Sequence, residues 1–407
     1  MDERMKKLLV VGLFVLSVIG IGTALYFAFF RSASQPEDVL PESTDTSSGS
    51  LPEGATGGTR LSPSAEEGEI LPTADLVARG GTTQVTELTS APVENTAIGS
   101  SGRDVNYYDP EDGRFYAIDA SGNAVRLSDQ AFPSVESVSW NQGGDKAVLE
   151  FPDGANIVYD FDAEKQVTLP AHWEDFAFAP GSDQIIAKSI ALDPSNRWLI
   201  TSNADGSNAK PIQALGDNAH KVIVSWSPND QIVAFADTGD PQPGGMDRKM
   251  IIPLGKNQEN FKGLIVEGYG FQPVWSPDGR RLLYSASGSV SDLKPMLWLV
   301  DATPGSLGDN RRSLGVNTWA DKCTFASASS VYCAVPASLP NNAGLGRSLF
   351  ESTPDFLYKI DLVTGRAALV AIPEEARPME RLSVSADESV LYFTNFDSGN
   401  LEMIRLK

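Results

Sequence analysis

The 407-residue chain contains 53 acidic and 32 basic residues, which give it a formal net charge of −21. This surplus argues against a nucleic-acid partner, because a phosphate backbone repels a strongly acidic surface. The chain has only two histidines, His172 and His220, and two cysteines, Cys323 and Cys333. A metal site built from His and Cys is therefore not expected, and a Ser–His–Asp site would have to use one of these two histidines.

The N-terminus carries a membrane signal. An uninterrupted run of uncharged, mostly apolar residues from Leu8 to Phe30 is long enough to span about 30 Å of hydrocarbon as a helix. The basic residues before it are Arg4, Lys6 and Lys7. The positive-inside rule therefore predicts a cytoplasmic segment at 1–7, a transmembrane anchor at 8–30 and an extracytoplasmic remainder. The alternative is a cleaved signal peptide, but such a peptide carries only about 7–15 apolar residues.

The segment after the apolar run has the composition of a disordered stalk. Residues 31–81 are dominated by Ser, Thr, Pro, Gly, Glu and Asp, and their few large apolar residues follow no helical or strand period. Such a segment cannot bury enough apolar surface to offset the entropy lost on ordering. We predict an acidic, flexible stalk with a root-mean-square reach of about 40 Å.

A repeated motif dominates residues 82–407. Each copy is a short apolar strand, a polar turn rich in Pro, Asp and Gly, and a second apolar strand, which is a β-hairpin pattern. The copies are WSPDGRRLLYS at 275–285, WSPNDQIVAFA at 226–236, WNQGGDKAVLEF at 140–151, FAPGSDQIIAKS at 178–189 and VSADESVLYFTN at 384–395. Their spacing of roughly 40–50 residues, with about four strands per unit, is typical of a β-propeller.

The repeats predict an all-β, seven-bladed propeller. Residues 93–128 form a first blade, and later blades begin near Val135, Glu174, Val222, Phe271 and Ala320. The chain then ends with only three strands of a seventh blade, at 382–385, 390–394 and 401–406. We expect residues 82–88 to supply the missing strand and close the ring, because an open ring leaves apolar faces uncovered. The alternative is six blades, if residues 82–98 are disordered.

Cys323 and Cys333 fall on the first and second strands of the predicted sixth blade. A hairpin that turns near Ala328 would place them opposite one another, at a separation that can be adjusted to a disulfide. Outside the cell such a pair can be oxidised. The alternative is that they are two small apolar residues in a strand.

The WSPDG motif followed by an apolar strand resembles the PD40 repeat of TolB-type propellers, a WD40-like family of extracytoplasmic bacterial proteins. The resemblance covers nearly all of residues 82–407 and is best at Trp275–Gly279 and Trp226–Asp230, whereas the sixth repeat, Thr324–Ser327, is degenerate. It implies a propeller fold and protein–protein interaction at the cell envelope. This chain departs from the family in its predicted anchor and stalk, and it lacks an evident extra domain of the TolB kind.

No local motif indicates an enzyme or a cofactor. The sequence contains neither the Gly-x-Ser-x-Gly elbow of propeller-gated peptidases nor a Gly-rich phosphate loop with lysine. The acidic clusters are Asp109, Glu111 and Asp112, and Asp160 and Asp162. Turn formation explains these clusters better than calcium binding. A hydrolase or lyase that pairs carboxylates from distant blades would leave no local motif and stays an alternative.

Loop length points to a binding face. The predicted loops between second and third strands are long in blade four (237–246), blade five (286–295) and blade six (336–354). Long structured loops usually have a role, and these three should form a raised arc on one face. Aromatic residues and arginine are the usual interface anchors. The candidate contact residues on this face are Trp173, Tyr269, Trp319, Arg347 and Phe350.

The alternative for the aromatic candidates is that they pack between blades, as we expect of Trp140, Trp226 and Trp275. Our interpretation of the whole sequence is a membrane-tethered, extracytoplasmic propeller that acts as a non-catalytic protein-binding or scaffolding module at the cell envelope. Its partners would be the membrane, through the N-terminal helix, and an envelope protein. The rival interpretations are a carbohydrate- or peptidoglycan-binding module, or a carboxylate-based hydrolase or lyase.

Overall fold

The computed structural model of the chain describes residues 16, 20, 21, 74–245 and 247–407. The chain divides into two compact units, Met1–Glu67 and Gly68–Lys407, and the second contains the propeller. The expected cytoplasmic segment, nearly all of the expected anchor and most of the expected stalk lie outside the described residues. Within the described part of the chain, no helix is long and apolar enough to cross a membrane.

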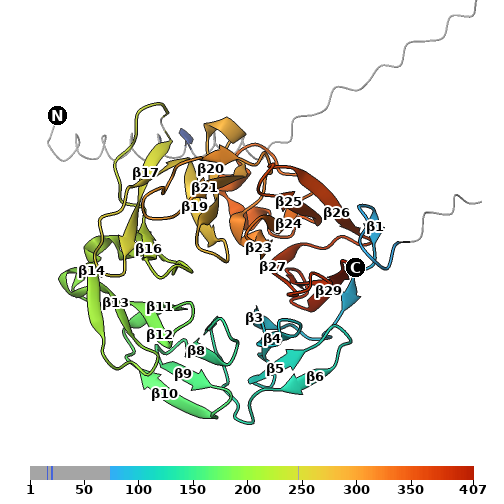
Figure 1. Cartoon of the computed structure of the whole chain (residues 1–407), viewed down its shortest axis with the longest axis horizontal. Helices are drawn as coiled ribbons and strands as arrows, with labels where there is room; N and C mark the ends of the chain where they lie inside the picture. The colour runs from blue at the N-terminus through green and yellow to red at the C-terminus, as the bar shows by residue number, and fades with distance from the viewer. Residues whose placement is uncertain (1–15, 17–19, 22–73, 246) are drawn as a thin grey trace, which may run out of the picture. The chain divides into compact units, whose positions relative to one another are not determined.

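Residues 82–405 build a ring of seven β-sheets, the blades of a β-propeller, of which six have four strands and one has five (Figure 1). Blade one contains β3 (Glu94–Ile98), β4 (Val105–Asp109), β5 (Arg114–Ile118) and β6 (Ala124–Arg126). Blade two contains β7 (Ser137–Trp140), β8 (Lys146–Glu150), β9 (Asn156–Asp160) and β10 (Lys165–Leu169). Blade three contains β11 (Trp173–Phe178), β12 (Gln184–Ser189), β13 (Trp198–Asn203) and β14 (Lys210–Ala214).

Four more blades complete the ring. Blade four contains β15 (Val222–Val224), β16 (Ile232–Ala236), β17 (Arg248–Gly255) and β18 (Leu264–Glu267). Blade five contains β19 (Tyr269–Trp275), β20 (Arg281–Ser287), β21 (Pro295–Asp301) and β22 (Arg312–Ser313). Blade six contains β23 (Cys323–Ser327), β24 (Ser330–Pro336), β25 (Asp355–Asp361) and β26 (Ala367–Pro373). Blade seven contains β27 (Met379–Val384), β28 (Val390–Asn395) and β29 (Leu401–Arg405).

The seventh blade takes its fourth strand from the segment before blade one. Strand β2 (Thr86–Glu87) pairs antiparallel with β29, with Thr86 opposite Met403. The Leu88 backbone N–H extends this pairing by donating to the carbonyl oxygen of Leu401 at 2.8 Å. The chain is therefore an all-β, seven-bladed propeller, and the predicted ring closure from the N-terminal side is confirmed.

The expected stalk extended to residue 81, but its last residues are ordered against the propeller. Ala78 donates its backbone N–H to the carbonyl oxygen of Arg405, and Gly80 donates to that of Val370, both at 2.8 Å. Strand β1 (Thr82–Thr83) then pairs in parallel with β26, as a fifth strand of blade six. Figure 1 shows β1 beside β26 at the edge of the ring. The polar composition was misleading because these contacts use backbone groups, which every residue type carries.

The repeated turn motif owes its form to one buried serine. The Ser276 hydroxyl accepts a hydrogen bond from the backbone N–H of Arg281 at 2.9 Å and lies 2.7 Å from Oδ1 of Asp278, to which it donates. Gly279 takes a positive φ of 64° in the same turn, a conformation that costs glycine little. In the copy at residues 385–390, hydrogen bonds from Ser389 and Ser385 lower the pKa of Asp387 to about 2. The Ser-x-Asp pattern therefore stabilises the turn through side-chain hydrogen bonds and is not a catalytic signature.

The core lies between neighbouring blades. Trp275 packs against the buried cluster that includes Phe235 of blade four and Tyr284 of blade five, and its indole N–H donates to Oγ of Ser225 at 3.0 Å. Trp140 stacks on Phe161, with ring centroids 5.0 Å apart, and donates to the carbonyl oxygen of Asn95 of blade one. The repeated tryptophans therefore join blades, as the sequence predicts.

Candidate functional site

Three neighbouring loops between second and third strands rise from one face of blades four, five and six. They join β16 to β17, β20 to β21, and β24 to β25. The second loop contains a short 3-10 helix, η3 (Ser289–Ser291). The third contains two more, η5 (Ala343–Leu345) and η6 (Arg347–Leu349). We call the described residues of these segments, at 237–245, 247, 288–294 and 337–354, the long-loop face.

The loops of blades four and five are bonded to one another. The Ser289 backbone N–H donates to Oδ2 of Asp247 at 2.6 Å. The Gly268 backbone N–H, in the connection between the two blades, donates to the carbonyl oxygen of Asp247 at 3.1 Å. One aspartate therefore fixes the end of the first loop against the beginning of the second.

The loops of blades five and six are also joined through their backbones. Asn342 donates its N–H to the carbonyl oxygen of Asp292 at 2.8 Å, and Gly344 donates to that of Leu293 at 2.9 Å. Gly344 packs so closely that a Cβ at this position would lie 1.9 Å from Oγ of Ser287. Only glycine fits there without a shift of the backbone. The three loops thus form one connected surface.

The longest loop is fastened to the blade beneath it by Arg347. Its guanidinium group pairs with Asp321 at 2.7 Å and lies 5.3 Å from the ring centroid of Trp319. Glu351 lies 3.5 Å away and adds a second, weaker ion pair. This side chain is therefore committed to contacts within the chain.

A buried ion pair holds the far end of the same loop. Asp355, the first residue of β25, accepts hydrogen bonds on Oδ2 from Nζ of Lys322 at 2.6 Å and from the backbone N–H of Met379 at 2.7 Å. Burial raises the pKa of Asp355, and the neighbouring lysine opposes that shift. Because each charge is uncompensated without the other, the pair fixes where the loop rejoins the sheet.

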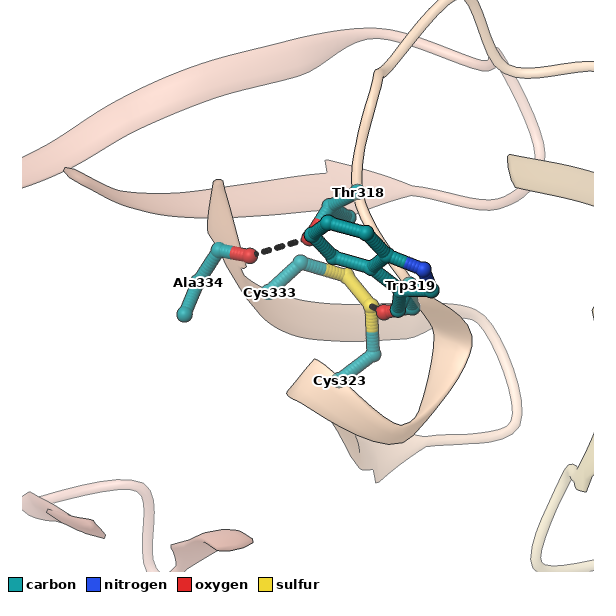
Figure 2. Close-up of a disulfide and its surroundings, with 5 residues drawn as sticks. All are labelled: Thr318, Trp319, Cys323, Cys333 and Ala334. Atoms are coloured by element: carbon teal, nitrogen blue, oxygen red, sulfur yellow. Dashed lines mark hydrogen bonds between the residues drawn. A yellow bond between two sulfur atoms is a disulfide. The ribbon is translucent and has the colours of Figure 1, made fainter. Parts of the chain in front are cut away.

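Beneath the loop, Cys323 and Cys333 are directly opposed residues of β23 and β24 and are joined by a disulfide (Figure 2). The carbonyl oxygen of Trp319 lies 3.9 Å from Sγ of Cys323. The neighbouring Thr318 donates its hydroxyl to the carbonyl oxygen of Ala334 at 2.6 Å. The disulfide therefore joins β24 to β23, the strand that follows the short segment bearing Trp319, over which Arg347 lies.

The long-loop face contains a hollow of about 630 Å³ where the three loops meet. Its lining consists of Asp247, Tyr269, Ser289, Asp292, Leu293, Asn341 and Asn342. Exposed apolar side chains stand on the same loops: Val290 is 63% exposed, Leu345 59% and Leu349 81%. These three exposed apolar residues on loops that are bonded to one another make the face a candidate contact site.

The five residues expected to contact a partner differ in how far their side chains are exposed. Trp173 and Trp319 are each only 5% exposed, so they pack inside the propeller, as the alternative interpretation proposed. Tyr269 is 48% exposed and lines the hollow. Phe350 is half-buried, and Arg347 is held by its ion pairs. Of the five, only Tyr269 presents a largely exposed side chain.

Sequence reasoning missed the apolar residues of the face. Val290, Leu345 and Leu349 are aliphatic, whereas the usual interface anchors are aromatic residues and arginine. The available signal was the presence of large aliphatic residues within polar loops rich in Ser, Asn and Gly.

The acidic clusters singled out in the sequence cap turns. Asp109 accepts the backbone N–H of Glu111 at 2.9 Å, and Asp112 accepts the hydroxyl of Tyr116 at 2.6 Å, which raises the pKa of that phenol. Asp160 accepts the backbone N–H of Ala163 at 2.8 Å. Across the residues that the structure describes, no group of three or more His, Cys, Asp and Glu side chains is placed to hold a metal ion.

The chain shows similarity to solved structures but to no family model and no curated protein. The chain is similar to the β-propeller domain of Cps50 (Swd1) from Myceliophteria thermophila, with a TM-score of 0.53 and 12% identity over 79% of this chain and 100% of that one.

Two oligogalacturonate lyases are similar to a comparable degree. One, solved in complex with manganese, has a TM-score of 0.56 and 16% identity over 81% of this chain and 97% of that one. The other, from Vibrio parahaemolyticus, has a TM-score of 0.55 and 12% identity over 79% of this chain and 93% of that one. At such low identity these likenesses show the propeller fold alone.

Proposed function

We propose that this chain is a membrane-tethered, extracytoplasmic, TolB-like propeller that binds an envelope protein through its long-loop face, without catalysis. The tether and its orientation follow from the apolar run at residues 8–30 and the basic residues before it. The resemblance of the WSPDG repeats to PD40 repeats favours a role at the envelope. The WD40-like blades of the chain would act as a scaffold that holds the three loops of the long-loop face.

The observation that carries the proposal is the display of apolar side chains on bonded loops. Leu345 and Leu349 are exposed, yet the loop that bears them is tied to the next loop by two backbone hydrogen bonds and to its own blade by Arg347. A loop already held in one conformation loses little entropy when a partner binds. Exposed apolar residues on such a loop bury surface on binding and so stabilise a complex.

The test is capture of a partner by the full-length chain in its native membrane. The double substitution Leu345→Ser and Leu349→Ser removes the apolar side chains and should abolish crosslinking to proteins that the natural chain captures. Val363→Ser, which alters a 62% exposed residue in the turn between β25 and β26, is the matched control and should leave capture intact. Deletion of residues 338–351 should likewise abolish capture.

Equal capture by the natural chain and by the Leu345→Ser/Leu349→Ser variant would refute the proposal. A chain that captures no protein but binds or turns over a glycan would favour the rival functions, namely carbohydrate binding or carboxylate-based hydrolysis or elimination. Those rivals predict dependence on side chains other than Leu345 and Leu349.

A further inference from the structure

The hollow in the long-loop face has an acidic lining that the proposed function leaves unused. Asp247 and Asp292 contribute its carboxylates, Asn341 and Asn342 its amides, and Tyr269 its aromatic ring. The hollow is open to solvent on a face that also exposes apolar side chains. Its chemistry therefore indicates which kind of side chain a partner would place there.

Neither carboxylate forms an ion pair with any residue that the structure describes. Among the described residues, only the backbone N–H and the hydroxyl of Ser289 donate to the carboxylate of Asp247. The exposed side chain of Asp292 accepts none from the described residues. Each therefore keeps acceptor positions that can be used by a ligand.

Nearby acidic residues are paired, in contrast. Glu267 lies 3.0 Å from Arg248 and 2.7 Å from Arg311. Asp237 pairs with Lys249, the lysine whose ammonium group lies 5.8 Å from the ring centroid of Tyr269. Arg248, Arg311 and Lys249 are thus paired with other acids, and none of the three forms an ion pair with Asp247 or Asp292.

The backbone around the hollow is held in a costly conformation. Asp292 and Leu293 both have positive φ, at 53° and 56°, and Asn342 has a φ of 67°. The left-handed region is unusual for a residue as bulky as leucine. This conformation places the carbonyl groups of Asp292 and Leu293 where Asn342 and Gly344 donate to them, and it leaves the Asp292 carboxylate at the hollow.

We propose that the hollow binds a basic side chain, preferably arginine, from the envelope protein; this inference rests on the proposed function. A guanidinium group is planar, so it can donate in pairs to a carboxylate and to amide oxygens while its face lies on an aromatic ring. Asp292, Asn342 and Tyr269 offer these three kinds of contact. The net charge of −21 favours the approach of a basic segment.

The test uses the full-length chain in detergent micelles and two small probes. Nα-acetyl-arginine amide is the basic probe, and Nα-acetyl-citrulline amide is its neutral isostere. Binding is measured by ligand-observed nuclear magnetic resonance at low salt. We expect the arginine probe to bind at least about tenfold more tightly than the citrulline probe, because two unpaired carboxylates attract only the charged one.

The double substitution Asp247→Asn and Asp292→Asn should remove this preference. Asparagine keeps the acceptor oxygen that Ser289 uses and tolerates the left-handed backbone at position 292, so the loops should keep their conformation. Asp162→Asn with Asp217→Asn changes the charge by the same amount at exposed residues away from the hollow and should leave the preference intact.

Equal binding of both probes, or no binding of either, would overturn the inference. Binding of triacetylchitotriose that is lost on Tyr269→Ala but unchanged by Asp247→Asn and Asp292→Asn would overturn it in favour of a sugar site. These outcomes do not depend on Leu345 and Leu349. Failure of the hollow to bind arginine is therefore distinguishable from failure of partner capture. Partner capture is tested by the Leu345→Ser/Leu349→Ser variant.

Discussion

The guanidinium group of Arg347 lies over the indole ring of Trp319, with 5.3 Å between its central carbon and the ring centroid. The same guanidinium group pairs with Asp321, which follows Trp319 by two residues. This one side chain links the longest loop to the segment that leads into blade six. Arg347 thereby fixes the position of the long-loop face relative to the packed blades beneath it.

Replacement of Arg347 should loosen the loop without unfolding the propeller. Arg347→Ala removes two ion pairs and a cation–π contact, all partly exposed, so we expect a loss of about 1 kcal/mol in the free energy of unfolding. Hydrogen exchange of residues 337–354 should accelerate, while exchange of β24 and β25 stays slow. Unchanged exchange in the loop would show that Arg347 does not hold it.

Gly344 provides a sharper test of the connection between loops. Gly344→Ala would place a Cβ 2.4 Å from Cβ of Ser287 and 2.8 Å from the carbonyl oxygen of Leu293, so the loop backbone must shift. We expect overpacking to cost about 1–3 kcal/mol and partner capture to fall. Gly305→Ala, where no atom lies within 4 Å of the added Cβ, is the control. Equal stability of the two variants, measured by urea unfolding, would contradict the packing described here.

The buried serine of the repeated turn should matter for stability and not for binding. Ser276→Ala leaves the backbone N–H of Arg281 without its acceptor and removes the bond to Asp278, so we expect a loss of about 1–3 kcal/mol in the free energy of unfolding. Ser121→Ala, at an exposed turn residue, should change it by less than about 0.5 kcal/mol. A binding defect in a folded Ser276→Ala variant would instead indicate a functional role for the turn.

The redox state of Cys323 and Cys333 reports on where the propeller resides. A disulfide persists in an oxidising compartment, whereas the cytosol keeps thiols reduced. We expect rapid acid quenching of cells, followed by alkylation, to find both cysteines oxidised in the full-length chain. Two alkylated thiols would contradict the extracytoplasmic location.

The fold could be predicted because each blade repeats the same local chemistry. Trp226 and Trp275 begin turns of the same kind, and their period fixed both the blade length and the number of blades. The closing strand could be predicted because the last blade has only three strands of its own, and an open ring would leave apolar faces uncovered. Strand β1 was missed, since a two-residue parallel pairing has no counterpart elsewhere in the chain.

The site could be predicted only in outline. Loop lengths located the long-loop face, but the sequence could not separate Tyr269, which is exposed, from Trp319, which is buried. Tyr269 begins a first strand and Trp319 precedes one, but the Arg347 side chain from the longest loop lies over Trp319, which is buried, whereas Tyr269 is 48% exposed. The exposure of Leu349 depends on how that loop folds, which in turn depends on the close approach of Gly344 to Ser287.

The most direct test of the account is site-specific photocrosslinking in intact cells. A photoreactive amino acid is placed at position 349, on the long-loop face, and separately at position 363, in a turn between the third and fourth strands of blade six. We predict a defined adduct with one envelope protein from position 349 and none from position 363. Identical adducts from both positions, or none from position 349 in a chain that is folded and present in the membrane, would contradict the claim that this face binds a partner.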